Sequence, residues 1–196
     1  MCNAKKNPSS MKKPTYKYPD FVSKVELKSE NGKRYWLNLK IDENKTDGIT
    51  VILKNPSRAD KIVSDKTVFN VSNYIHRNRE KYPELKNVGE ITILNLMPNY
   101  MTESSGLKEF KESIVDRENI RIIKEFCGKN RNVIIAWGNH PNGLFKEYEK
   151  LKNETMKILT ENQNQVFYVD KLSKYGNPKH GQVWAYANEL IKVVES

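Results

Sequence analysis

Four short polar clusters carry the side chains of this sequence that could bind or react with a ligand. They are Lys-Asn-Pro-Ser at 54–57, Asn95 with Thr102, Trp-Gly-Asn-His at 137–140, and Tyr-Gly-Asn-Pro-Lys-His at 175–180. Amides, hydroxyls, ammonium groups and an imidazole can hold phosphates, bind base edges or transfer a proton. Each cluster follows an apolar run, so we expect the four clusters to converge on one binding site.

Each cluster also has a structural interpretation. An Asn-Pro-Ser turn after a strand often only ends that strand. The Asn95 carboxamide lies in an apolar run, so once buried it must find partners, either by capping a neighbouring loop or by binding a ligand. Trp137 is a residue type found more often in cores. His180, in a loop rich in glycine and proline, is the histidine best placed for chemistry.

The runs before the clusters are typical of strands buried on both faces. They are short, rich in β-branched residues and separated by helical patterns. The predicted strands are GITVILKN (48–55), EITILNLM (90–97), NVIIAWG (132–138) and QVFYVD (165–170). The predicted helices are 65–81, 107–129, 141–162 and 185–195.

This alternation predicts an α/β fold with three α/β/α layers and a mostly parallel central sheet of about four core strands. Two alternating runs, 21–28 and 33–41, flank Asn31-Gly32 and predict an N-terminal hairpin. Residues 1–19 are polar and basic, so we expect a flexible arm before a single domain at 20–196. Ligands of such sheets bind beyond the carboxyl ends of the strands.

Positive charge is concentrated near the N-terminus. The chain has 34 Lys and Arg against 24 Asp and Glu, a net charge of +10, and residues 1–40 hold 10 basic and 3 acidic residues, or +7 of it. Such a basic segment indicates a polyanionic partner, nucleic acid or a nucleotide, with DNA expected rather than RNA. The alternative is a solubilising tail.

Several classes of site are excluded by absent residues. With only Cys2 and Cys127, the chain cannot build a disulfide framework, a four-cysteine zinc site or an iron–sulfur cluster. It lacks the glycine-rich nucleotide motifs, the Gly-x-Ser-x-Gly motif and histidines at metal-binding spacing, so we expect no cofactor and no metal. There is no long apolar run and no secretory leader, so we expect a cytoplasmic protein without a membrane partner.

Taken in order, the clusters resemble the signatures of an uncharacterised bacterial and phage family, a domain of unknown function. ILKNPSRADKIVSDKTV (52–68) resembles its LNPSxAD and DPT opening. Asn95-Leu96 with Thr102, and then RENIRII, AWG and YGNPKH, resemble its later signatures over about residues 33–184. Lys54, Lys66 and the Gly-Gln-Val after His180 depart from that pattern, and the last departure concerns the shape of the final loop.

At fold level the chain is also similar to the uracil-DNA glycosylase superfamily. This resemblance implies that Asn55 holds a water, that Asn95 binds the edge of a base, and that His180 stabilises the departing base. It implies further base or ligand contacts from Thr102, Trp137 and Tyr100, the last in place of a stacking residue that is not obvious here. The candidate phosphate-binding residues are Lys54, Ser57 and Lys179.

Three functions stay open on the sequence. The first is hydrolysis of an N-glycosidic bond in nucleic acid, as in base excision. The second is a non-catalytic nucleotide or nucleic-acid binding module, and the third is a hydrolase of small nucleosides or nucleotides. An asparagine amide is no strong base, which favours the second, while Asp60 and Asp65 either supply catalytic carboxylates or cap the next helix.

Overall fold

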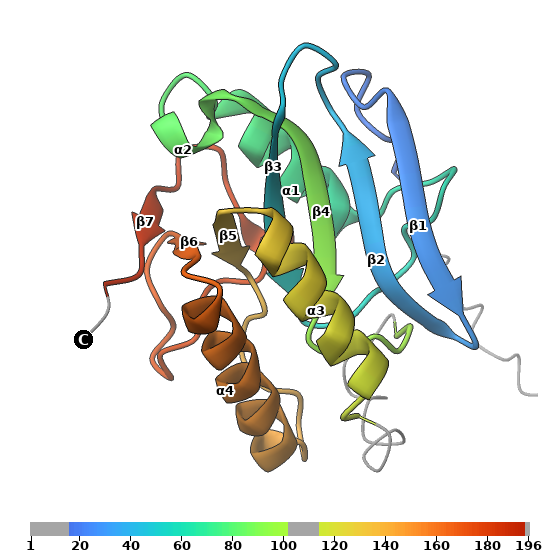
Figure 1. Cartoon of the computed structure of the whole chain (residues 1–196), viewed down its shortest axis with the longest axis vertical. Coiled ribbons are helices and arrows are strands. Elements are labelled where there is room, and N and C mark those ends of the chain that lie inside the picture. Colours follow the sequence, from blue (N-terminus) through green and yellow to red (C-terminus); the bar gives the residue numbers. More distant parts are fainter. Residues whose placement is uncertain (1–15, 102–113, 195–196) are drawn as a thin grey trace, which may run out of the picture.

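A single open sheet runs through the molecule, whose computed structural model describes residues 16–101 and 114–194. Within these ranges seven strands are ordered β1-β2-β4-β3-β5-β6-β7 (Figure 1). The strands are β1 (Lys24–Glu30), β2 (Lys33–Lys40), β3 (Asp47–Leu53), β4 (Val88–Asn95), β5 (Asn132–Ile135), β6 (Gln165–Val169) and β7 (Leu190–Lys192). The helices are α1 (Lys66–Arg77), α2 (Pro83–Lys86), α3 (Arg117–Lys129), α4 (Phe145–Glu161) and the 3₁₀ turn η2 (Gly181–Val183).

The sheet is mixed and not mostly parallel. Its centre agrees with the prediction, because β4, β3, β5 and β6 are parallel neighbours. Antiparallel pairing joins β1 to β2, β2 to β4, and β6 to β7, so half of the six pairings are antiparallel. The predicted hairpin adds two antiparallel strands at one edge, and β7, which was not predicted as a strand, adds another at the opposite edge.

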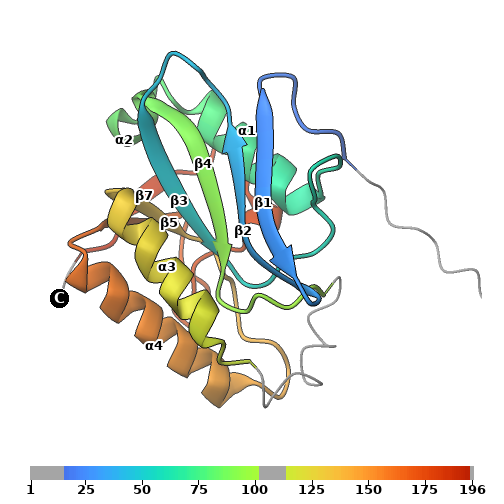
Figure 2. The same ribbon diagram turned by 45° about the vertical axis from the view of Figure 1, so that its right-hand side comes forward.

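Helices lie against both faces of the sheet (Figure 2). Alternate side chains of a strand point to opposite faces, so Val51 and Leu53 pack in one apolar cluster with α1, whereas Ile52 packs in a second cluster with α3 and α4. The two clusters bury most large apolar side chains of the described residues. None of the helices described is long and apolar enough to cross a membrane.

The β1–β2 turn and the start of α1 lie where the local sequence predicted them. Asn31 and Gly32 both take positive φ values, 50° and 71°, in the tight turn of the β1–β2 hairpin. Asp65 caps α1, since its carboxylate accepts the backbone N–H of Val68 at 2.9 Å. Of its two proposed roles, capping is therefore the one that the structure displays.

The predicted helix at 185–195 is wrong. Residues 190–192 form strand β7, which pairs antiparallel with β6. The bonds from Asp170 N to Glu189 O and from Val193 N to Val166 O extend this pairing. The free edge of β6 offers unpaired backbone groups, and satisfying them outweighs a weak local preference for helix.

Residues 16–18, which belong to the segment predicted to be a flexible arm, contact the folded domain. Tyr16 and Ser64 exchange two backbone hydrogen bonds, and the Tyr18 hydroxyl donates to the carbonyl of Asp60. These contacts place residues 16–18 against the loop that follows β3. Residues 1–15 of the expected arm lie outside the described residues.

Candidate functional site

The candidate site lies where β3 meets both of its parallel neighbours. β3 pairs with β4 on one side and with β5 on the other, so the chain changes winding direction at this strand. In open α/β sheets such a point opens a crevice at the carboxyl ends of the strands. The predicted clusters that follow β3, β4 and β5 all begin at this end of the sheet.

Backbone hydrogen bonds join the chain segments that leave β3 and β4. Leu96 N donates to Leu53 O, and Met97 N donates to Lys54 O, both at 2.9 Å. Farther out, Met101 N donates to Pro56 O at 2.9 Å. The first two predicted clusters are therefore held side by side by the main chain itself.

The carboxamide of Asn55 is oriented by this arrangement. Its Nδ2 donates to Pro56 O at 3.0 Å and to Met101 O at 2.8 Å. An amide nitrogen has two N–H groups, and here both have backbone partners. The group that Asn55 can still offer a ligand is its Oδ1 acceptor, in a fixed orientation.

Asn95, the last residue of β4, carries a buried amide without partners. The residue is fully buried, and neither Nδ2 nor Oδ1 bonds to any part of the chain that the structure describes. Its side chain points to the α1 face, by strand alternation from Ile93 in the same cluster. Asn95 thus caps no loop of the described residues, and its role in ligand binding stays a prediction.

His180 leads into η2 and is held against the end of the sheet by two glycines. A Cβ built on Gly138, whose φ is +67°, would lie 3.1 Å from His180 Cβ, and one on Gly181 would lie 3.3 Å from Leu53 Cδ2. Leu53 is also the register partner of Asn95. Asn95 and Gly181, the residue after His180, therefore both neighbour Leu53, while the convergence of the Asn95 and His180 side chains stays a prediction.

Burial and hydrogen bonding keep the imidazole of His180 neutral, with its proton on Nε2. Burial lowers its pKa from 6.5 to about 4, the Lys54 charge lowers it further, and Asp65 opposes the shift. Gln182 N donates to Nδ1 at 3.2 Å, so Nδ1 is the acceptor and the ring proton lies on Nε2. The site therefore contains an uncharged N–H donor.

Both aspartates of the β3 exit loop bind backbone. Asp60 Oδ1 accepts the N–H groups of Ile62 and Val63 at 2.7 and 2.9 Å. Asp65, besides capping α1, accepts from Arg58 N and Ala59 N with its other oxygen. Within the described residues, no group of three or more His, Cys, Asp or Glu side chains could hold a metal ion.

A buried arginine fixes the same loop from the hairpin. Arg34 of β2 is 1% exposed, and its Nη1 donates to Ala59 O at 2.9 Å. Burial lowers its pKa, and the nearby Asp65 carboxylate raises it. The guanidinium also lies 6.0 Å from the ring centroid of Tyr100, which places the predicted stacking residue beside the hairpin.

The expected phosphate ligands are not equivalent. Lys54 is half-buried at the end of β3, and burial lowers its pKa. Ser57 lies half-buried in the same exit loop. Lys179 forms an ion pair with Asp170, so its charge is already compensated within the fold. Of the two lysines, Lys54 is the one whose charge lowers the pKa of His180.

Of the other expected ligand residues, Trp137 does not lie at the site. Trp137 is buried in the second cluster, with α3 and α4, and not on the face that carries Asn95. Its carbonyl accepts the Tyr148 hydroxyl at 2.8 Å, but its indole N–H has no partner in the described residues. Thr102 lies outside the residues described.

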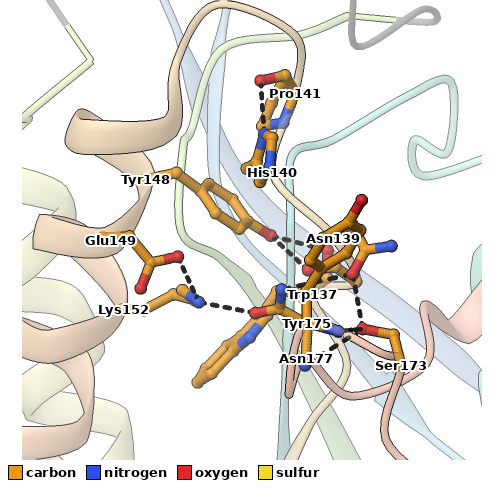
Figure 3. Close-up of polar contacts among 11 residues, drawn as sticks. Trp137, Asn139, His140, Pro141, Tyr148, Glu149, Lys152, Ser173, Tyr175 and Asn177 are labelled. Carbon is orange, nitrogen blue, oxygen red and sulfur yellow. Dashed lines mark hydrogen bonds and ion pairs between the residues drawn. The ribbon is translucent and has the colours of Figure 1, made fainter.

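A polar network joins the loops that follow β5 and β6 (Figure 3). Asn139 Oδ1 accepts from Ser173 Oγ at 2.8 Å and from Asn177 Nδ2 at 3.3 Å. Lys152 Nζ of α4 donates to Asn177 Oδ1 at 2.6 Å and pairs with Glu149 at 2.7 Å. These bonds make the two loops one rigid unit next to His180.

This unit carries exposed aromatic rings that sequence reasoning missed. The rings of His140 and Phe145 meet edge to face at 5.1 Å, and the rings of His140 and Tyr175 lie 6.3 Å apart. Phe145 is 57% and Tyr175 60% exposed. The available signal was an aromatic residue beside lysine at the start of α4, Phe145-Lys146, and in the loop after β6, Lys174-Tyr175.

A family model described as "Protein of unknown function (DUF1643)" matches residues 34–181. The chain belongs to this family. The match confirms the expected membership of a family of unknown function, and the DUF1643 region reaches from Arg34 to the glycine after His180. No curated protein and no solved structure matches the chain.

Proposed function

We propose that this chain binds a nucleobase of DNA at the carboxyl end of its sheet and releases it by hydrolysing the N-glycosidic bond. The observation that carries the proposal is the fully buried, unpartnered carboxamide of Asn95, next to the loop of a neutral histidine donor. A carboxamide pairs with a base edge through one donor and one acceptor. A bound base would therefore satisfy both atoms that the fold leaves unbonded.

The residues of the loops divide the chemistry between them. Asn55 Oδ1 accepts a hydrogen bond from the water that attacks C1′ as the C1′–N bond breaks. An amide removes no proton, so the water's proton passes to solvent, and the released base anion takes one up from solvent. His180 Nε2–H donates to the base as negative charge develops on it, without first needing protonation. One such donor is worth about 10²–10³-fold in rate. Release therefore depends mainly on stabilising the departing base.

The arrangement of the strands supports a uracil-DNA glycosylase-like site. Successive parallel strands are followed by Asn-Pro at 55–56, by Asn95, by Trp-Gly at 137–138 and by the loop of His180, in the order that the resemblance requires. Helices on both faces of the parallel strands agree with a three-layer fold. Lys54 would then contact a phosphate beside the bound base.

A non-catalytic base-binding module is the second candidate. It is favoured by the bonding of Asp60 and Asp65, whose carboxylates accept backbone N–H groups and cap the loop and α1. Without a carboxylate to activate water, the same residues would bind a base and not release it. This candidate predicts the same ligand and the same effect of changing Asn95.

Base release separates the two candidates. DNA strands containing uracil, hypoxanthine or a mismatch are incubated with the protein, and free base and abasic sites are measured. We expect release by the wild type, with Asn55→Ala and His180→Ala each reducing the rate by about 100-fold or more. His76→Asn, at the other end of α1, is the matched control and should keep the wild-type rate.

The outcomes distinguish the candidates from one another. Binding of these strands without release supports the binding module. Release that persists in both Asn55→Ala and His180→Ala contradicts the residue assignment. Neither binding nor release on any of the strands contradicts the proposed function as a whole.

Deleting residues 1–15 tests the basic segment separately. This segment contains four lysines and ends just before Tyr16, whose pairing with Ser64 the deletion leaves in place. If these lysines neutralise phosphates, the slope of log K against log salt becomes less steep by up to about 3 on single strands. An identical slope for the full chain and the truncated protein would remove the segment from the interface.

A further inference from the structure

An exposed aromatic surface with lysines lies beside the candidate site. It is built from His140 after β5, Phe145 at the start of α4 and Tyr175 in the loop after β6. Lys174 Nζ lies 5.0 Å from the centroid of the Tyr175 ring, and Lys146 is exposed next to Phe145. We refer to His140, Phe145, Tyr175, Lys146 and Lys174 as the aromatic platform.

Hydrogen bonds anchor the chain segments that carry the aromatic platform. Tyr148 donates its hydroxyl to Trp137 O at 2.8 Å and to Gly138 O at 3.0 Å, which anchors the loop of His140 to α4. The Asn139–Ser173–Asn177 bonds anchor the loop of Tyr175 to that of His140 (Figure 3). Loops that are already anchored lose little conformational freedom when a ligand stacks on the rings they carry.

The chemistry of the platform fits single-stranded nucleic acid. Exposed rings provide stacking surfaces for unpaired bases, and neighbouring lysines provide phosphate contacts. A duplex hides the faces of its bases and so offers these rings nothing to stack on. The net charge of +10 disfavours a basic protein partner and favours a polyanion.

Both loops of the platform are connected to His180. Gly138, two residues before His140, packs against His180, since a Cβ built on it would lie 3.1 Å from His180 Cβ, and Tyr175 lies five residues before His180 in the same loop. We propose that the aromatic platform stacks the unpaired bases of a single strand that flank the base bound at Asn95 and His180. This inference rests on the proposed function for the bound base and adds the strand state that the site takes.

The test measures binding of the full chain to a fluorescently labelled oligothymidylate by anisotropy. Oligothymidylate contains only normal bases, so its binding does not depend on base release. We expect Phe145→Ala and Tyr175→Ala each to weaken binding by about 10-fold, as the loss of one stacked base predicts. Tyr175→Phe keeps the ring and should bind like the wild type.

Tyr186→Ala is the matched control for removing an exposed ring. Tyr186 is 41% exposed, lies outside the platform and has the Arg77 guanidinium 4.1 Å from its ring centroid. It should bind oligothymidylate like the wild type, and urea midpoints should show that all four variants fold. Lys174→Gln should reduce the salt dependence of binding, with a log–log slope less steep by about 1.

The platform and the proposed function fail in different ways. Loss of binding in Phe145→Ala and Tyr175→Ala, with normal binding by the control, supports the platform even if no base is ever released. Equal binding by wild type and both alanine variants overturns it, as does equal loss in Tyr186→Ala. Tighter binding to a duplex of the same length than to the single strand also overturns it.

Discussion

Replacing Asn95 by leucine is expected to stabilise the protein and to abolish base recognition. The two side chains share a branched shape and the same number of non-hydrogen atoms, and the Asn95 amide is buried with no partner in the described chain. A buried amide without hydrogen bonds costs about 1–3 kcal/mol. Asn95→Leu removes this cost, so the free energy of unfolding should rise by about that amount in urea titrations.

Asn119 provides the matched comparison, because its buried amide does have partners. Asn119 Nδ2 donates to the carbonyls of Asn95 and Leu96, at 2.9 and 3.2 Å. Asn119→Leu should therefore lower the free energy of unfolding by about 1–3 kcal/mol. Opposite signs for two buried asparagines would identify Asn95 as a residue kept for its ligand. A destabilised Asn95→Leu protein, or one that still binds base-containing strands, would contradict that role.

The stability of the protein is expected to fall with acid because of His180. The folded state holds its pKa at about 4, whereas the unfolded chain has the ordinary value of 6.5. Below pH 6.5 His180 binds a proton in the unfolded chain but stays neutral in the folded chain. Stability therefore declines until the pH reaches about 4. The difference corresponds to a loss of up to about 3 kcal/mol.

Urea titrations between pH 7.5 and about 4 measure this effect. His180→Asn keeps an acceptor for Gln182 N without a titrating ring, so its unfolding free energy should vary less with pH than that of the wild type. A residual dependence is expected from His76, whose pKa burial and the Arg79 charge also lower. Equal pH dependence in wild type and His180→Asn would show that the imidazole is not held neutral by the fold.

The central part of the fold was predictable because it depends on local signals. Continuous β-branched runs gave the four parallel strands, Asn31-Gly32 gave the hairpin turn, and Asp65 gave the start of α1. The last element was not predictable in this way. Residues 190–192 have a weak helical pattern, and only the exposed edge of β6, a tertiary feature, makes them a strand.

The candidate site was predictable in part. Asn55, Asn95 and His180 reach the same end of the sheet because each follows a strand or closes onto one. Strand alternation could have excluded Trp137, since it points with Ile135 away from the α1 face. The ion pair of Lys179 with Asp170 could not be read from the sequence, because it depends on the path of a loop.

Neither the neutral state of His180 nor the aromatic platform could be predicted without knowledge of the three-dimensional packing. An imidazole acquires a low pKa only through burial and a nearby cation, and neither is encoded at its own position. In the same way, Phe145 and Tyr175 are separated by 29 intervening residues, and only the joining of two loops brings both beside His140. Composition alone could not distinguish these exposed rings from core aromatics.

The guanidinium of Arg34 has a consequence for the order in which the molecule assembles. It belongs to the hairpin, which closes through contacts between near neighbours, yet it holds the carbonyl of Ala59 beyond β3. The shape of the loop carrying Asn55 thus depends on the docking of the hairpin beside β4. A shortened chain starting after β2 would lose this bond together with Leu37 and Leu39, which are fully buried in the core.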